Sequence, residues 1–225
     1  MIQRASKFMG NDPVHAWRRG MTLSARDNSL MLYATDNVSM IEAEVSTQSE
    51  ADTDTILPGR FVKILLDTVK RTDLDLLEVG EGWVMAKFAD ETVVCAQTDI
   101  EVNLDGYESI FVKCEDEVED YFLVSEDVLK AAGNAASILS VIQEDHLKLD
   151  LQESDLTFTA GESNRAESKE KVSIKHKNHP DISVWATGKE LLRLLEEDAS
   201  MSIIPQAVVV RGDGFMALLS TGSDD

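Results

Sequence analysis

Histidines are the first residues in this chain whose type and spacing suggest chemistry. His176 and His179 lie close enough in sequence for two imidazoles to share a metal ion. Only Asp181 is near them as a further ligand, and no cluster of Cys, Asp or Glu completes a ligand set. We therefore interpret this stretch as a polar loop and predict no metal site.

Other residues that often carry chemistry also have simpler interpretations. The pairs Gly80-x-Gly82 and Gly212-x-Gly214 lie between strand-like runs, and they lack the Lys and the strand-to-helix setting of a phosphate-binding loop. Cys95 and Cys114 are too few for a disulfide framework. The abundant acidic residues show no pair that separates an acid from a base. We predict no catalytic residues, no cofactor and no enzymatic activity.

The composition is strongly acidic. The 225 residues carry a formal net charge of −21, although Lys and Arg still number 21. Hydrophobic residues make up 43% of the chain, which is enough for a packed core, and no apolar run approaches the ~20 residues of a membrane span. These features indicate a soluble, cytoplasmic protein without a membrane partner. The net charge alone disfavours nucleic-acid binding, so the distribution of the basic residues decides that question.

A repeat organises the elements that position those residues. The helical pattern after Pro58 is followed by strand-like runs at 74–79, 83–88 and 92–97, and the helix after Thr187 by runs at 201–205, 207–211 and 215–220. Upstream of each copy the same plan recurs. A short helix at 2–9 precedes strands at 21–26, 29–36 and 38–46, and a helix from Ser125 to about Ile142 precedes strands at 147–152, 155–160 and 170–175.

Four copies of a helix plus a three-stranded meander predict an α+β fold. Because one meander cannot bury its own apolar face, the copies must pack in pairs. We therefore expect a first domain at 1–107, an inter-domain connector at 108–119 and a second domain at 120–225. The stretch from Ile100 to Asp120 is acidic and mostly non-periodic, and the run from Gly161 to Ser168 is expected to be an exposed loop.

Basic residues recur on all four predicted helices, on the sides turned away from most of the apolar residues. They are Arg4, Lys7, Arg60, Lys63, Lys70, Arg71, Lys130, Lys189 and Arg193. On any one helix such charges are most simply its solvated face. Their recurrence in so acidic a chain favours a positive surface that attracts a polyanion. No set of residues in this chain is suited to reading the edges of bases, so we expect the positive surface to bind nucleic acid without sequence specificity.

In these patterns the chain resembles the DNA sliding clamps, a superfamily that includes the bacterial β clamp, the phage clamps and proliferating-cell nuclear antigen. Leu30-Met31-Leu32-Tyr33-Ala34-Thr35-Asp36 matches the strand that ends in an Ala-Thr-Asp signature. Ile56-Leu57-Pro58-Gly59-Arg60-Phe61 matches the entry to the second helix. Two departures are visible. The second domain has Thr159-Ala160-Gly161-Glu162 where the signature would fall, and the first domain lacks the strand that the family places before its first helix.

The resemblance implies a processivity factor. Clamps of this type close a ring of six such domains with the helices lining the hole, so two domains per chain imply a homotrimer around double-stranded DNA. The resemblance also implies DNA polymerase and a clamp loader as partners, in a bacterial or phage-infected cell. Their peptides would bind a hydrophobic pocket that includes Met40, Ile110, Phe111, Val112, Met216 and Leu218.

Two alternatives stay open at this point. Met216 and Leu218 fit ordinary core packing at least as well as a partner pocket. A clamp-like or acidic, DNA-mimicking scaffold that binds proteins without encircling DNA would also explain the acidic composition.

Overall fold

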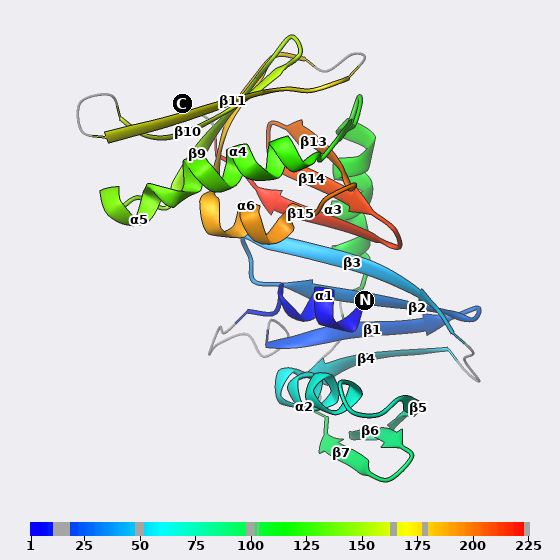
Figure 1. The fold of residues 1–225 in the computed structure, drawn as a ribbon. Helices are drawn as coiled ribbons and strands as arrows, with labels where there is room; N and C mark the ends of the chain where they lie inside the picture. The colour runs from blue at the N-terminus through cyan, green and yellow to red at the C-terminus, as the bar shows by residue number, and fades with distance from the viewer. Residues whose placement is uncertain are drawn as a thin grey trace. The chain divides into compact units, whose positions relative to one another are not determined.

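The computed structural model describes residues 1–10, 19–47, 52–97, 102, 104–162, 166–176 and 180–222. The chain divides into two compact units, unit 1 from Met1 to Tyr107 and unit 2 from Glu108 to Asp225. Each is α+β, with antiparallel sheets and few helices (Figure 1). No helix of the described residues is long and apolar enough to cross a membrane.

In its described residues, unit 1 contains two antiparallel sheets, two complete helices and the first residues of a third helix. Its strands are β1 (Gly20–Arg26), β2 (Ser29–Thr35), β3 (Ser39–Ser46), β4 (Thr53–Pro58), β5 (Leu74–Gly80), β6 (Trp83–Phe88) and β7 (Thr92–Ala96), and its complete helices are α1 (Ile2–Ser6) and α2 (Gly59–Val69). The strands lie in the orders β4-β1-β2-β3 and β5-β6-β7. Alternating apolar residues of β1 and β2 meet across the first sheet, where Leu23 pairs with Leu32.

The Ala-Thr-Asp signature forms the turn between β2 and β3. The Thr35 hydroxyl donates to the Ser39 carbonyl over 2.9 Å, and Asp36 Oδ1 accepts from the backbone N–H groups of Val38 and Ser39 at 3.1 and 2.8 Å. These side chains satisfy the backbone while Asn37 adopts a φ of +79°. In this chain, therefore, the signature has a structural role in holding a tight turn.

Unit 2 repeats the plan of unit 1. Its strands are β8 (Phe122–Leu123), β9 (His146–Gln152), β10 (Asp155–Glu162), β11 (Ala166–Ser173), β12 (Ile182–Thr187), β13 (Ser200–Ile204), β14 (Ala207–Gly212) and β15 (Phe215–Ser220), and its helices are α4 (Glu126–Ser137), α5 (Leu139–Ile142) and α6 (Gly188–Leu194). The strand orders are β11-β10-β9-β12 and β15-β14-β13-β8. Thus α6 followed by β13-β14-β15 corresponds to α2 followed by β5-β6-β7.

Local signals in the sequence account for many of these elements. Ser125 caps α4, as predicted, and its hydroxyl accepts from the Val128 N–H at 3.4 Å. Asp27 and Asn28 both take positive φ in the two-residue turn between β1 and β2. Gly82 and Gly214, which the sequence assigned to turns, also have positive φ. The predicted strands at 83–88 and 215–220 are confirmed residue for residue as β6 and β15.

The acidic stretch that we interpreted as a non-periodic connector is in fact largely helical. Helix α3 runs from Leu104 to Glu117 (Figure 1). Four side chains at helical spacing are buried along one face, namely Leu104, Tyr107, Phe111 and Cys114. Within unit 2, Arg211 on β14 forms an ion pair of 2.5 Å with Glu115 and so holds the C-terminal part of α3. The acidic residues on its exposed face hid this periodicity in the sequence.

The expected loop from Gly161 to Ser168 is also shorter than predicted. Strand β10 continues to Glu162 and pairs with Ala166 at the start of β11, while residues 163–165 lie outside the described part of the chain. Backbone pairing between the two strands therefore extends further than the polar side chains indicated.

Candidate nucleic-acid interface

Helix α2 carries the largest group of predicted DNA-facing residues. Phe61, Val62, Leu65 and Thr68 are buried on one side of the helix. Arg60 and Lys63 are exposed on the helix, and Lys70 and Arg71 are exposed just past its C-terminal end. The 3.6-residue period thus separates an apolar face from a basic one, as the sequence predicted.

An acidic residue that sequence reasoning missed lies among these cations. Asp67 Oδ1 is 3.0 Å from Lys70 Nζ. The hydrogen bond and the charge of Lys70 hold the pKa of the Asp67 carboxyl below its usual value, with smaller contributions from Lys63 and Arg71. The spacing of Lys63, Asp67 and Lys70, four and three residues apart, is the signal that could have identified it.

Two further contacts orient the arginines of α2. Arg71 Nη2 is 3.4 Å from Glu91 Oε1, and both side chains are substantially exposed. Arg60 Nη2 lies 3.7 Å from the sulfur of the buried Cys95 on β7. The two guanidinium groups therefore lie against β7 and the loop before it, while Lys63 has an exposed side chain.

Helix α1 adds Arg4 and Lys7. Arg4 is half-buried, with Nη1 4.0 Å from the sulfur of Met1, and Lys7 is exposed at the C-cap. Lys7 and Lys70 both follow the C-terminal end of a helix, where a cation is also stabilised by the helix dipole. That stabilisation is an alternative reason for their positions.

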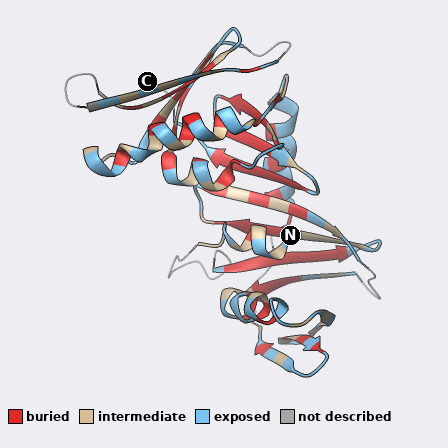
Figure 2. Ribbon diagram, in the orientation of Figure 1, coloured by how far each residue is buried: buried red, intermediate tan, exposed pale blue. Residues whose placement is uncertain are grey.

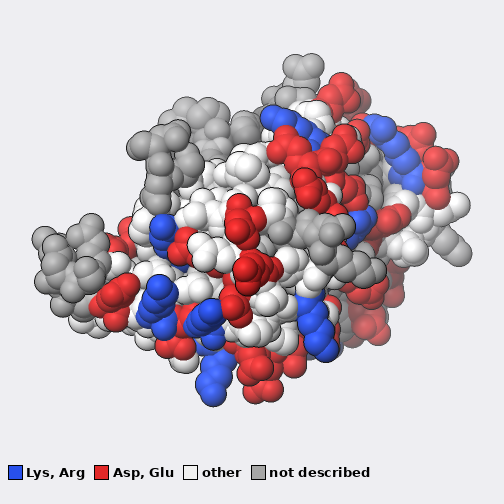
Figure 3. All heavy atoms as spheres, turned by 90° about the horizontal axis from the view of Figure 1, so that it is seen from above, with Lys and Arg blue, Asp and Glu red and all other residues white. Residues whose placement is uncertain are grey.

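In unit 2 the predicted residues have more acidic surroundings. Lys130 is exposed on α4, whose first turn carries Glu126 and Asp127. Lys189 is exposed on α6, whereas Arg193 is mostly buried and paired with Glu190 one turn away. Basic and acidic side chains of the described residues are interspersed on the face drawn in Figure 3. The positive charge is therefore weaker on these helices than on α2.

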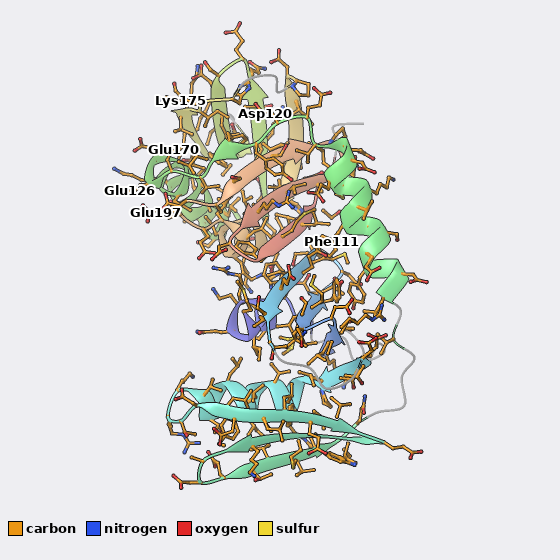
Figure 4. The ribbon with its side chains drawn as sticks, turned by 90° about the vertical axis from the view of Figure 1, so that its right-hand side faces the viewer. Phe111, Asp120, Glu126, Glu170, Lys175 and Glu197 are labelled. Carbon is orange, nitrogen blue, oxygen red and sulfur yellow. The ribbon has the colours of Figure 1, made fainter. Side chains whose placement is uncertain are left out.

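The six predicted partner-pocket residues differ in exposure. Ile110 and Val112 are 43% and 56% exposed on α3, Met40 is intermediate, and Phe111, Met216 and Leu218 are buried. Figure 4 shows Phe111 on α3. The burial agrees with core packing for Met216 and Leu218, which the sequence left open. The binding role of the six residues stays a prediction.

Only one histidine of the predicted loop lies within the described residues. The ring of His176 contacts the carbonyl of Glu153, while His179 lies outside the described residues. In the described ranges no three His, Cys, Asp or Glu side chains group closely enough to hold a metal ion.

Comparison with solved structures identifies the fold. The DNA polymerase sliding clamp of Pseudomonas aeruginosa matches with a TM-score of 0.84 at 18% identity over 99% of this chain. The β subunit of DNA polymerase III from Thermotoga maritima matches with a TM-score of 0.86 at 13% identity over 100% of the chain. The chain has the sliding-clamp fold. The sliding clamp of Caulobacter crescentus gives a TM-score of 0.83 at 15% identity over 99% of the chain.

The match in sequence is much weaker than the match in fold. The chain spans 63%, 62% and 62% of these three clamp structures, which is less than two thirds of each. No protein-family model and no curated protein matches the sequence.

Proposed function

We propose that this chain is a subunit of a DNA sliding clamp that encircles duplex DNA without sequence specificity and performs no catalysis. Two units per chain require three copies for a ring of six, so the proposed assembly is a homotrimer. Its partners are a DNA polymerase, which it tethers, and a clamp loader, in the cytoplasm of a bacterial or phage-infected cell.

The observation that carries the proposal is the basic face of α2 in a clamp-type fold. Arg60, Lys63, Lys70 and Arg71 are all exposed there, in a chain whose net charge is −21. Phosphate contacts come from such side chains, and binding through them is independent of base sequence. Acidic residues elsewhere would repel the duplex from other surfaces and so favour contact at the helices.

The decisive experiment combines assembly with processivity. We expect multi-angle light scattering to give the mass of a trimer, and image averages to show a hole of duplex width. We also expect the variant Arg60→Glu, Lys63→Glu, Lys70→Glu to lose processive synthesis while its thermal unfolding is unchanged.

A control variant separates position from charge. Lys87→Glu, Lys113→Glu, Lys175→Glu changes the net charge by the same amount at exposed positions outside the predicted interface. Processivity should survive in this control. Equal loss in both variants, or full processivity in the α2 variant, would contradict DNA encirclement through these residues.

A protein-binding scaffold is the second candidate, favoured by the acidic residues interspersed among the cations of unit 2. It predicts that the wild-type chain stays monomeric, leaves polymerase processivity unchanged and binds a basic protein in a salt-dependent manner.

A further inference from the structure

Strand β5 forms an open edge of the smaller sheet in unit 1. The order is β5-β6-β7, so one side of β5 pairs with β6 and the other has no strand partner among the described residues. An unpaired edge presents backbone N–H and C=O groups that can pair with another extended chain. Native proteins usually protect such an edge with a short strand, charges or a covering segment.

The equivalent edge in unit 2 is occupied. In unit 2, β13 corresponds to β5 and β14 corresponds to β6. Strand β13 pairs with β14 on one side and with β8 on the other, where Ser200 lies opposite Leu123 and Met201 opposite Phe122. Two backbone hydrogen bonds extend this pairing, from the Val124 N–H to the Ala199 carbonyl at 2.8 Å and from the Asp198 N–H to the Val124 carbonyl at 3.1 Å. The chain itself therefore provides a template for a strand at this position.

The template also defines the side-chain pattern of the added strand. Phe122 and Val124 are buried, while Leu123 between them is 56% exposed. The apolar side chains thus point into unit 2 at alternate positions, as expected for a strand with one face on a core.

The residues of β5, which has no strand on its outer side in the described part of the chain, are less buried than those of β13, which has β8. Met201, Ser202, Ile203 and Ile204 of β13 are all buried, but no residue of β5 is buried. Leu76 on β5 is 47% exposed, and the apolar residues Leu77 and Val79 are of intermediate burial. Figure 2 colours the ribbon by these burial classes. A surface hollow runs along β5. Its lining includes the apolar side chains of Leu23, Leu30, Val45 and Leu66 and the charged side chains of Lys63, Asp67 and Lys70.

We propose that the β5 edge is a docking site for an extended segment of a partner protein that carries apolar residues at two alternate positions. The segment would add an antiparallel strand to β5 and place its apolar side chains in the hollow. Backbone pairing would supply affinity, and the two apolar contacts would supply specificity. The hollow borders Lys63 on α2 and Lys70 at its end, so the docking site adjoins the basic face. The open sheet edge, and not DNA binding, supports the site.

A second copy of this chain is a poorer occupant. Every named strand of the described residues already belongs to a sheet. In a second copy, the strand that matches the template is β8, which already pairs with β13, and its Phe122 and the adjoining Val124 are buried. The occupant must bring an apolar face that is not already packed, and a segment without a core of its own can do so.

The test uses the full chain and a labelled synthetic peptide with the sequence of residues 119–125, which contains β8. We expect saturable binding by fluorescence anisotropy, and at least about tenfold slower amide exchange in β5 when the peptide is bound. A control peptide with Phe122→Asp and Val124→Asp should not bind. In the protein, Leu76→Lys should weaken binding by about tenfold or more because it places a charge in the hollow.

The matched control in the protein is Val94→Lys. Val94 is 61% exposed on β7, at the opposite edge of the same sheet, so this variant should bind the peptide like the wild type. The proposal is overturned if the peptide does not bind, or if Leu76→Lys and Val94→Lys weaken its binding equally. It is also overturned if the peptide slows amide exchange in β13 instead of β5, because the peptide would then have replaced β8. Protection of β5 that rises with protein concentration alone would assign the edge to a second copy and would also overturn it.

Discussion

Lys70 Nζ lies 3.0 Å from Asp67 Oδ1 across one turn at the end of α2, so the basic face of this helix contains a carboxylate. The ion pair is exposed, and exposed pairs contribute little to folding stability. Its main consequence is electrostatic, because Asp67 offsets part of the positive charge offered by Lys63, Lys70 and Arg71.

Replacement of that carboxylate should strengthen DNA binding. In Asp67→Asn one negative charge leaves the basic face and Lys70 becomes available to a phosphate, so we expect the affinity for duplex DNA to rise by about two- to fivefold at low salt. The dependence of affinity on salt should also become steeper. Fluorescence anisotropy over a salt series measures both quantities.

Asp116→Asn is the matched control, because Asp116 is exposed on α3 and its replacement changes the net charge equally. An equal rise in both variants would mean that net charge, and no particular face, governs binding.

A second ion pair gives a pH dependence with a defined sign. Lys171 Nζ is 2.7 Å from Asp155 Oδ2, and the hydrogen bonds from Lys171 and Ser173 lower the pKa of the Asp155 carboxyl from its ordinary value of 3.8. A carboxyl whose pKa is lower in the folded state stabilises the fold above its unfolded pKa, and this contribution is lost as pH falls through the folded pKa.

Asp155→Asn should therefore be less stable than the wild type at pH 7, and the difference should shrink below about pH 3.8. Urea unfolding of both proteins across that range measures it. A difference that stays constant with pH would show that the ionised carboxylate is not responsible.

Neighbouring residues of α3 should respond differently to truncation. Phe111 is 2% exposed, so Phe111→Ala leaves a cavity and should lower the free energy of unfolding by about 3–5 kcal/mol. Ile110→Ala and Val112→Ala remove exposed side chains and should each change it by less than about 1 kcal/mol.

Chemical denaturation of these three variants tests the burial pattern, and binding of a polymerase peptide tests the partner role. If Ile110→Ala and Val112→Ala bind the peptide like the wild type, the predicted role of these two side chains is wrong.

The residues of α3 also show what sequence reasoning could and could not recover. Alternation identified most strands because one face of each is buried, and the cap at Ser125 identified α4. Helix α3 was missed, although Leu104, Tyr107, Phe111 and Cys114 have helical spacing. These four buried positions lie among many charges, and the exposed apolar residues Ile110 and Val112 obscure their period. Strand β8 was missed because two residues carry too little pattern to stand out.

The exposure of the candidate interface residues could be predicted in part, for a similar reason. Helical periodicity correctly placed Arg60 and Lys63 on an exposed face. It could not show that Arg193 is mostly buried beside Glu190, because an ion pair depends on the rotamers of both side chains and on the packing around them. Sequence spacing predicts which face a residue occupies, but not how much of its charge the neighbours neutralise.

Two glycines near the helices of unit 2 should respond oppositely to alanine. A Cβ on Gly133 in α4 meets no atom within 4 Å, so Gly133→Ala should raise the free energy of unfolding by about 0.5–1 kcal/mol, because alanine loses less conformational entropy in a helix.

A Cβ on Gly188 would lie 2.4 Å from Leu139 Cδ1 and 3.3 Å from Leu147 Cγ, so Gly188→Ala should lower the free energy of unfolding by about 1–3 kcal/mol. Thermal unfolding measures both, and Leu139→Ala combined with Gly188→Ala should recover part of the loss attributed to crowding. Absence of that recovery would mean that the cost at Gly188 comes from the start of α6 and not from contact with Leu139.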